Sequence, residues 1–350
     1  MMKAFHLPIA ATHENRGKGG FPRPGAGVKL AMIKHGLTLA SEEHSPAKLV
    51  EIAVAAEQAG FDFVSISDHF HPWISEQGHS PFVWSVLGAL SQATSNLKVG
   101  VGVTCPTVRM HPAISAHAAA TAACLLEGRF TWGVGTGEAL NEHVLGDPWP
   151  PAEVRLEMLE EAVEIIRGLW KGESFTHRGR HYTVEDARIF DLPEKLPPIV
   201  ISAFGEEAVE LAARIGDGLW ITGLEADAIE KYRDQGGKGQ VWSQLSLCWD
   251  PDREVAVDRA HRIWPNTALT GQLAQDLRTV GHMEQAVEMV HRFDIEKSLP
   301  CGPDAGPIIE SIEQAARIGI DHVYLHQIGD PLDGFIEFWR DEILPKVEGL

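Results

Sequence analysis

Short apolar runs and amphipathic stretches alternate along the chain from residue 32 onward. Apolar and β-branched residues concentrate at 32–39, 63–68, 97–104, 129–136, 198–202, 218–222, 240–248 and 322–326. These runs have the length of strands, and the nearly unbroken Val/Gly run at 97–104 is typical of a strand buried on both faces. Helical periodicity is found at 46–59, 81–93, 112–126, 152–170 and 334–345. The pattern therefore predicts strands that alternate with helices.

Eight strands alternating with helices predict an α/β fold in which a parallel sheet closes into a (β/α)8 TIM barrel. Two segments interrupt the repeat. One is a hairpin at 175–184, within an insertion of about 171–197, and the other is a mostly helical excursion at 262–312. Insertions of this kind commonly shape the pocket over the carboxyl ends of barrel strands. We predict a single barrel domain over 32–350, preceded by an N-terminal extension at 1–31.

The composition narrows the classes of function. The chain has 350 residues and a formal net charge of -19, with no local run of Lys and Arg, which argues against nucleic acid as a partner. The four cysteines lie far apart and form no CxxC pair, so neither a disulfide framework nor a structural zinc site is expected. No apolar stretch reaches transmembrane length, and the N-terminus makes a poor signal peptide. We therefore expect a cytoplasmic protein that does not bind membranes.

Polar residues follow the second predicted strand, where the mouth of a barrel lies. Asp68 and His69 come at its end, and a histidine there has a pKa near working pH and can take a proton from an alcohol. A histidine that is merely hydrogen-bonded in a loop gives the same pattern. His69 and His71 also form an HxH pair. Because the fifth and sixth strands end in Ser202 and Thr222 rather than in further ligands, no metal site is predicted.

Two glycine-containing segments follow the third and fourth predicted strands. Segment 133–142 reads GVGTGEALNE; its GxGxG spacing is not a dinucleotide-binding fingerprint, but its glycines would let the backbone approach a flat or phosphorylated ligand. Within it, Glu138 is either an acid at the mouth or a residue that only complements a helix dipole. At 102–107, Gly102 allows unusual backbone geometry that would brace a flat ring, or simply a turn before Pro106.

Three motifs carry a resemblance to a known family. They are SDHFxPW at 67–73, TxPTxRxxP at 104–112 and GVGTGEALNE at 133–142. In order and spacing they closely resemble the F420-dependent glucose-6-phosphate dehydrogenases, within the luciferase-like family of flavin and deazaflavin enzymes. The likeness extends from about residue 33 to the C-terminus and is strongest at 36–142. It implies a luciferase-like TIM barrel, the deazaflavin coenzyme F420 and, by analogy, a homodimer.

The same resemblance implies roles for individual residues. His69 resembles the general base that removes the hydroxyl proton as hydride leaves carbon, and Glu138 resembles the acid opposite it. Trp73 resembles the indole that stabilises the reacting centre, and Glu42 matches an active-site glutamate. Gly102 and Val103 fall where the family has a non-proline cis peptide behind the ring. The residues expected at the coenzyme are Asp68, Gly102, Val103, Thr104, Cys105, Gly137, Glu138, Ala139 and Asn141.

The substrate site departs from the family pattern, which holds a sugar phosphate with a threonine and three basic side chains. Here Thr222 is retained, Glu225 occupies a lysine position, and 268–277 contains no basic residue. Lys297 is the candidate to replace the arginine. A glutamate repels a phosphate dianion, and each lost charge-assisted bond is worth roughly 1.5–3 kcal/mol. We therefore expect a neutral sugar, polyol, secondary alcohol or ketone rather than glucose 6-phosphate.

Other functions stay open at this point. One is an FMN-dependent luciferase-like monooxygenase, and another is a sugar-phosphate dehydrogenase with a rebuilt phosphate site. A third is a non-catalytic deazaflavin-binding protein. The combination of Asp68, His69 and Glu138 favours an F420-dependent dehydrogenase or reductase acting on CH–OH groups.

Overall fold

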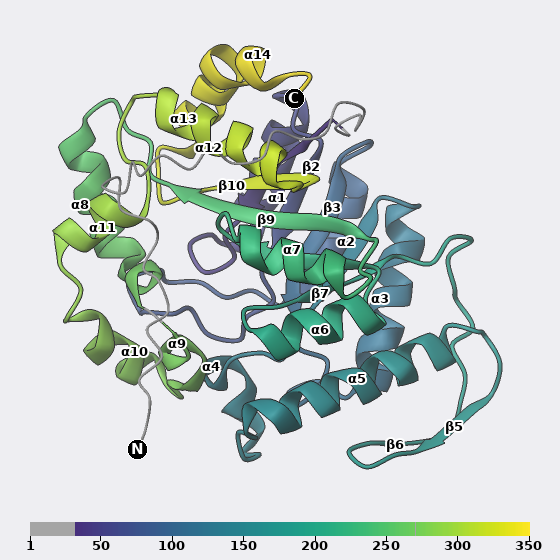
Figure 1. Ribbon diagram of the computed structural model, residues 1–350. Helices are drawn as coiled ribbons and strands as arrows, with labels where there is room; N and C mark the ends of the chain where they lie inside the picture. Colours follow the sequence, from purple (N-terminus) through teal and green to yellow (C-terminus); the bar gives the residue numbers. More distant parts are fainter. Residues whose placement is uncertain (1–31, 270) are drawn as a thin grey trace.

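Eight parallel strands close into a barrel, which confirms the predicted fold class (Figure 1). The computed structural model describes residues 32–269 and 271–350, so the extension predicted at 1–31 lies outside the described residues. Around the barrel the strands follow the order β1-β10-β9-β8-β7-β4-β3-β2. The strands are β1 (Lys34–Leu39), β2 (Phe63–Ile66), β3 (Lys98–Thr104), β4 (Phe130–Val134), β7 (Ile199–Ser202), β8 (Gly218–Thr222), β9 (Gln240–Leu247) and β10 (His322–Gln327).

Helices connect the strands and cover the outside of the barrel. Proline occupies the first turn of α1 (Pro46–Gln58) and α3 (Pro112–Leu126), where its missing N–H removes no helical hydrogen bond. The Ser45 hydroxyl caps α1 by accepting from the Lys48 amide at 3.4 Å. In the described part of the chain, no helix is long and apolar enough to cross a membrane. The other outer helices are α2 (Val83–Ala93), α5 (Ala152–Leu169), α6 (Glu206–Ile215), α7 (Ala226–Asp234), α8 (Arg253–Ile263) and α12 (Gly306–Ile318).

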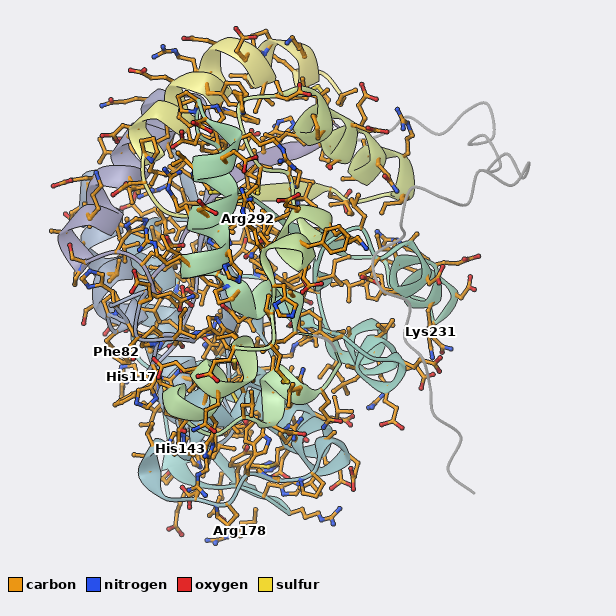
Figure 2. The ribbon with its side chains drawn as sticks, turned by 90° about the vertical axis from the view of Figure 1, so that its left-hand side faces the viewer. Phe82, His117, His143, Arg178, Lys231 and Arg292 are labelled. Carbon is orange, nitrogen blue, oxygen red and sulfur yellow. The ribbon has the colours of Figure 1, made fainter. Side chains whose placement is uncertain are left out.

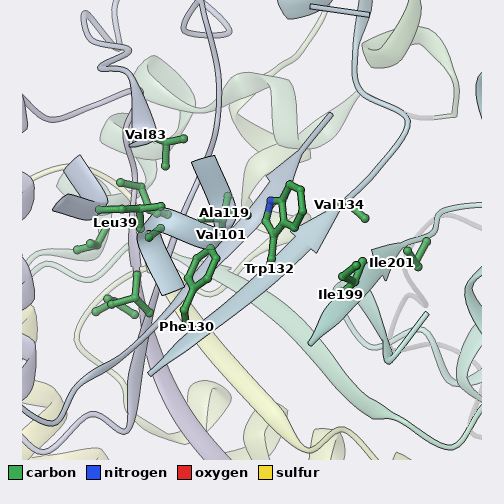
Figure 3. Packing of buried hydrophobic residues seen from close by; sticks show 14 of the residues in the cluster. Leu39, Val83, Val101, Ala119, Phe130, Trp132, Val134, Ile199 and Ile201 are labelled. Atoms are coloured by element: carbon green, nitrogen blue, oxygen red, sulfur yellow. The ribbon is translucent and has the colours of Figure 1, made fainter. Parts of the chain in front are cut away.

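Apolar side chains pack on both faces of the closed sheet. On the outer face they pack under the helices, among them Leu39, Val101, Trp132 and Ile201 (Figure 3). On the inner face they form an aromatic plug, which consists of Phe63, Val200, Trp220, Trp242 and Tyr324. Trp220 stacks on Trp242 with ring centres 5.0 Å apart, and its Nε1 donates to the Tyr324 hydroxyl at 2.6 Å. Because the plug fills the barrel interior, a ligand has to bind at the rim.

Two strands end earlier than predicted. β2 ends at Ile66 rather than at residue 68, because its ladder stops where it pairs with Leu39, the last residue of β1. β4 ends at Val134 rather than at residue 136, after its last pair with Ile201 of β7. The predicted catalytic residues therefore lie in loops beyond the strands, at the carboxyl rim.

Both predicted irregular segments have the expected kind of structure. β5 (Phe175–Arg178) and β6 (Thr183–Ala187) form an antiparallel hairpin at the periphery of the molecule, where Arg178 is labelled in Figure 2. The excursion at 262–312 is mostly helical. It contains η2 (Pro265–Ala268), α9 (Leu273–Asp276), α10 (Val280–Val287), α11 (Arg292–Ser298) and the start of α12.

The C-terminal segment predicted as a helix at 334–345 is helical from Leu332 to Val347, but not as a regular α-helix throughout. The segment consists of α13 (Leu332–Phe338), a π-helical turn η3 (Trp339–Ile343) and a final short helix α14 (Leu344–Val347). Pro345 has no N–H to donate to the carbonyl four residues earlier, so a regular α-helical ladder cannot continue through it.

Candidate active site

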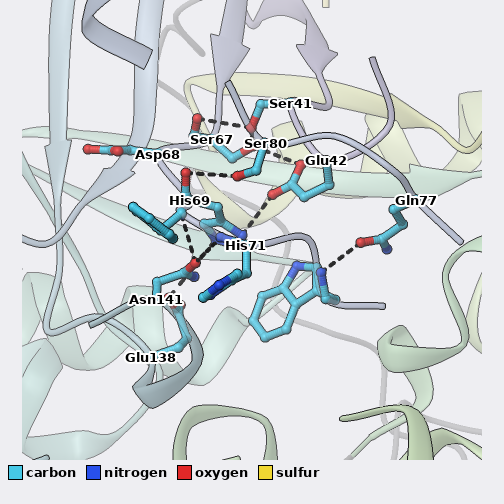
Figure 4. A network of polar contacts seen from close by, with 12 residues as sticks. Ser41, Glu42, Ser67, Asp68, His69, His71, Gln77, Ser80, Glu138 and Asn141 are labelled. Carbon is cyan, nitrogen blue, oxygen red and sulfur yellow. Dashed lines mark hydrogen bonds and ion pairs between the residues drawn. The ribbon is translucent and has the colours of Figure 1, made fainter. Parts of the chain in front are cut away.

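Three loops at the carboxyl rim bring one imidazole between two carboxylates. Glu42 follows β1, His69 follows β2, and Glu138 precedes α4 (Ala139–Glu142) after β4. The Nδ1 atom of His69 lies 2.9 Å from Glu42 Oε1, and its Nε2 atom lies 4.0 Å from Glu138 Oε2. Figure 4 shows Glu42 and Glu138 on different sides of His69. Three residues singled out from the sequence thus converge, although 27 positions separate Glu42 from His69 and 69 positions separate His69 from Glu138. The parallel strands bring them together because their carboxyl ends meet at one rim.

The charge state of His69 follows from these neighbours. Burial alone would lower the pKa of His69, but the Glu42 carboxylate, assisted by Glu138 and Asp68, raises it to about 9. Burial would likewise raise the pKa of Glu42, but the charge of His69 lowers it below its ordinary value. The resting form at neutral pH is therefore an imidazolium, with a proton on each ring nitrogen. His69 is ready to donate a proton, and it becomes a base only after losing one.

Further contacts orient the histidine and its partner. The Ser67 hydroxyl donates to Glu42 Oε2 at 2.9 Å, and the Ser80 hydroxyl donates to the His69 carbonyl at 2.8 Å. The Trp73 ring lies edge-on to the imidazole, with ring centres 5.1 Å apart and planes at 72°. The predicted indole is therefore in contact with the predicted proton-transfer residue.

Asn141 fastens the loop that carries the histidine. Its Oδ1 accepts from the amides of Phe70 at 2.8 Å and His71 at 3.0 Å. The His71 Nδ1 atom lies 3.0 Å from the Leu140 carbonyl, and its ring stacks on His143 with ring centres 5.8 Å apart. The described residues contain no group of three or more His, Cys, Asp and Glu side chains placed to hold a metal ion.

An arginine to which the sequence reasoning assigned no role connects three rim loops. Arg109 lies after β3, and its Nη2 atom is 3.0 Å from Asp68 Oδ1 while its Nε atom is 3.4 Å from Glu142 Oε1. All three side chains are buried, and burial, only partly offset by Arg109, raises the pKa of Glu142 to about 7. The sequence did contain a signal for this role. Arg109 is the basic residue of the motif at 104–112, and a buried acid such as Asp68 needs a cationic partner.

Protein atoms crowd two of the rim glycines. The Gly102–Val103 peptide is cis, as the resemblance implies. A Cβ atom at Gly102 would lie 2.5 Å from the Trp220 ring, and one at Gly137 would lie 2.6 Å from Cys105 Sγ. Protein atoms therefore occupy the space that a side chain at these two positions would need. Backbone contacts with a coenzyme stay a prediction, as do the contacts of Thr104 and Ala139, which are buried at the same rim.

The predicted substrate residues occupy two places. Thr222 ends β8 and is exposed, and the exposed Glu225 directly precedes α7 in the same loop. Lys297 lies on α11, where its Nζ atom is 4.1 Å from the centre of the Phe293 ring. A joint substrate site of Thr222, Glu225 and Lys297 stays a prediction.

Sequence comparison shows relatives along almost the whole chain. Residues 28–322 match the family model described as luciferase-like monooxygenase. A protein of Segniliparus rotundus named F420-dependent glucose-6-phosphate dehydrogenase is 34% identical over 333 residues, covering 91% of this chain and 99% of that protein. A Mycobacterium tuberculosis protein of the same name is 32% identical over 336 residues, covering 92% and 100% of the two chains.

Solved structures share the fold. An F420-dependent secondary alcohol dehydrogenase, in complex with an F420-acetone adduct, superposes with a TM-score of 0.84 at 29% identity, covering 90% of this chain and 99% of that one. The coenzyme F420-dependent tetrahydromethanopterin reductase of Methanopyrus kandleri superposes with a TM-score of 0.74 at 19% identity, covering 91% and 100%. This chain belongs to the luciferase-like monooxygenase family.

Proposed function

We propose that this chain is a coenzyme F420-dependent oxidoreductase that transfers a hydride between a neutral alcohol, such as a sugar or a secondary alcohol, and the corresponding carbonyl compound. The observation that carries the proposal is the position of His69, which lies between Glu42 and Glu138 at the barrel rim and against the Trp73 ring. Support for the coenzyme comes from the relatives that are named F420-dependent dehydrogenases.

The rim residues fit a planar coenzyme with polar edges. Asp68 Oδ2, Thr104 Oγ1 and Asn141 Nδ2 are buried, and within the described residues none has a hydrogen-bond partner. Buried polar atoms are normally paired, so an acceptor, a hydroxyl and a donor left unpaired at one rim favour a ligand that supplies the partners. These side chains, and the backbone segments 102–105 and 137–141, would bind the coenzyme. When bound, the deazaflavin supplies two-electron hydride chemistry, because carbon replaces the nitrogen that lets flavins react with oxygen.

In this proposal His69 handles the proton of the substrate oxygen. Its Nδ1 atom faces Glu42, which leaves Nε2 to face Glu138 and the rim. In carbonyl reduction, Nε2–H donates a proton to the substrate oxygen, and this form is already present because the pKa of His69 is about 9. In alcohol oxidation, a neutral Nε2 accepts the hydroxyl proton, so the oxidation should accelerate as the pH rises toward 9. Glu138 is the residue that we assign to the second proton.

The charges around Thr222 favour a neutral substrate. Glu225 lies in the loop that Thr222 begins, so a phosphate placed beside Thr222 would meet a carboxylate rather than an ammonium group. A sugar-phosphate dehydrogenase with a rebuilt site would need Lys297 to reach the same place, and Lys297 stacks on Phe293 of its own helix. We therefore assign neutral alcohols and ketones to the site.

The test is a substrate panel with oxidised F420, following the loss of its visible absorbance. The panel contains secondary alcohols, polyols, free sugars and glucose 6-phosphate. We expect a neutral alcohol to have the highest kcat/KM, and glucose 6-phosphate to be a poor substrate. A kcat/KM for glucose 6-phosphate that rivals the best alcohol would contradict the substrate assignment. Oxygen-dependent turnover with reduced FMN, and none with F420, would instead indicate a monooxygenase.

A further inference from the structure

A second glutamate–histidine pair lies at the same rim. His326, near the end of β10, has a side chain that is 1% exposed, and its Nε2 atom lies 3.3 Å from Glu43 Oε1. Glu43 also accepts a hydrogen bond from Trp264 Nε1 at Oε1 and one from the Gly329 amide at Oε2, the latter at 2.7 Å. These donors surround the carboxylate, so its position and the direction of its hydrogen bond to His326 are well defined.

The other ring nitrogen of His326 faces neutral polar groups. Because Nε2 donates to the Glu43 carboxylate, a neutral His326 presents Nδ1 as an acceptor. This Nδ1 atom lies 3.4 Å from Ser246 Oγ and 3.5 Å from Gln244 Nε2, and the same Gln244 atom lies 3.4 Å from Ser246 Oγ. These distances are longer than the usual range of about 2.7–3.2 Å for strong hydrogen bonds, so the three groups bind one another only weakly. They can therefore still form strong hydrogen bonds to a ligand.

The three side chains face the mouth of the barrel. Gln244 and Ser246 lie two and four residues after Trp242 of the aromatic plug along β9, so they project to the same inner face, nearer the carboxyl rim. His326 pairs in register with Ser246, and Gln244 pairs with Thr222 at the end of β8. Both β9 residues are partly exposed, which leaves them accessible from the rim. The group is therefore continuous with the predicted substrate residue Thr222.

We propose that Gln244, Ser246 and His326 form a polar subsite that binds a hydroxyl group of the substrate other than the one that reacts, with Glu43 as a positioning residue. A hydroxyl can donate to His326 Nδ1 and accept from Gln244 Nε2 at the same time, whereas a ketone oxygen cannot donate. The lone pair on Nδ1 and the Glu43 carboxylate behind it disfavour an anion. The inference rests on the proposed function and narrows its substrates to diols, polyols and hydroxyketones.

The test compares two alcohols that differ by one hydroxyl, 2-butanol and 2,3-butanediol, with oxidised F420. We expect Ser246→Ala to raise KM for the diol roughly three- to tenfold, the usual effect of one lost neutral hydrogen bond, and to change KM for 2-butanol less than about twofold. Gln244→Met should act in the same direction. Ser311→Ala, at a partly exposed position on α12, is the matched control. Equal effects of Ser246→Ala on both alcohols would overturn the subsite.

Glu43→Gln examines the positioning role. Glutamine keeps the size of the side chain but weakens the acceptor that selects the Nε2–H form of His326. We expect KM for the diol to rise while kcat for 2-butanol stays within about twofold of the wild type. A proportional loss of kcat on both alcohols would mean that Glu43 only supports the fold. A preference for 3-amino-2-butanol over the diol would assign the subsite to a cation instead.

Ligand-observed NMR titration of the coenzyme-free protein separates the two proposals. Selective binding of 2,3-butanediol over 2-butanol that is lost in Ser246→Ala supports the subsite even if F420 gives no turnover, in which case only the proposed reaction fails. Turnover of both alcohols with equal KM, and no selective binding, retains the reaction and rejects the subsite.

Discussion

Two consecutive glutamates at one rim hold two histidines in very different surroundings. Glu42 faces His69 and Glu43 faces His326, and each imidazole has a tryptophan edge-on to it, Trp73 at 5.1 Å and Trp264 at 4.5 Å. The differences lie beyond the pairs. The free nitrogen of His69 faces a second carboxylate, Glu138, whereas that of His326 faces a serine hydroxyl and a glutamine amide.

We infer from this comparison that a glutamate–histidine pair does not by itself define a role. Two carboxylates around His69 stabilise an extra proton, which suits proton transfer to a substrate oxygen. Neutral donors and acceptors around His326 suit the binding of a hydroxyl group. The residues that face the second ring nitrogen therefore decide the role that we propose for each pair.

The largest expected effect is on the pair that we assign to proton transfer. His69→Ala should lower kcat about 10²- to 10⁴-fold for every substrate, whatever its number of hydroxyls, because the proton donor and acceptor is lost. Binding of F420, measured by fluorescence titration, should stay within a few-fold of the wild type. His117→Ala, on the exposed surface of α3 (Figure 2), is the control. Equal losses of turnover and coenzyme binding would make His69 a structural residue.

The pH dependence of stability should distinguish the two glutamates. Because the pKa of His69 is raised from 6.5 to about 9 in the folded protein, its contribution to stability is complete below pH 6.5 and is lost as the pH rises through 9. A shift of this size corresponds to roughly 3 kcal/mol. Glu42→Gln should remove this dependence from the free energy of unfolding measured in urea between pH 6 and 9.5. Glu43→Gln should retain this pH dependence. The opposite result would mean that the roles assigned to Glu42 and Glu43 must be exchanged.

A smaller effect is expected from the charge beside Thr222. Glu225→Lys places a cation next to Thr222, and we expect it to raise kcat/KM for glucose 6-phosphate roughly ten- to a hundredfold, the value of one charge-assisted bond. Glu230→Lys, an exposed position on α7, changes the net charge equally and is the control. If both variants improve the phosphate substrate alike, long-range charge rather than a local contact limits its use.

Much of the fold was predictable because it depends on local patterns. Apolar runs spaced by amphipathic stretches identified all eight barrel strands, and the helical excursion and the hairpin were found where the repeat is interrupted. Strand ends were less accurate, since β2 stops where its neighbour β1 stops, which is a property of the pairing. The C-terminal helix was predicted, but its π-helical turn was not, because apolar periodicity does not reveal the effect of the missing N–H of Pro345.

The candidate site was only partly predictable. His69, Glu138, Glu42 and Trp73 were identified from motifs near strand ends, and they do converge. The role of Arg109 was not predicted, because its partners Asp68 and Glu142 come from other loops. Glu43 and His326 were also missed because 283 positions separate them, and neither belongs to a recognisable motif. The homodimer and the cytoplasmic location stay predictions.

The sequence by itself determined the order of strands and helices and placed polar residues after particular strands, because both depend on side chains close together in the chain. Only the tertiary structure decided which of these residues meet, since closing the barrel brings the first and last strands side by side. It also decided the charge of His69, because burial and the nearby Glu42 carboxylate act on its pKa through space. The residues next to His69 in the sequence do not reveal either effect.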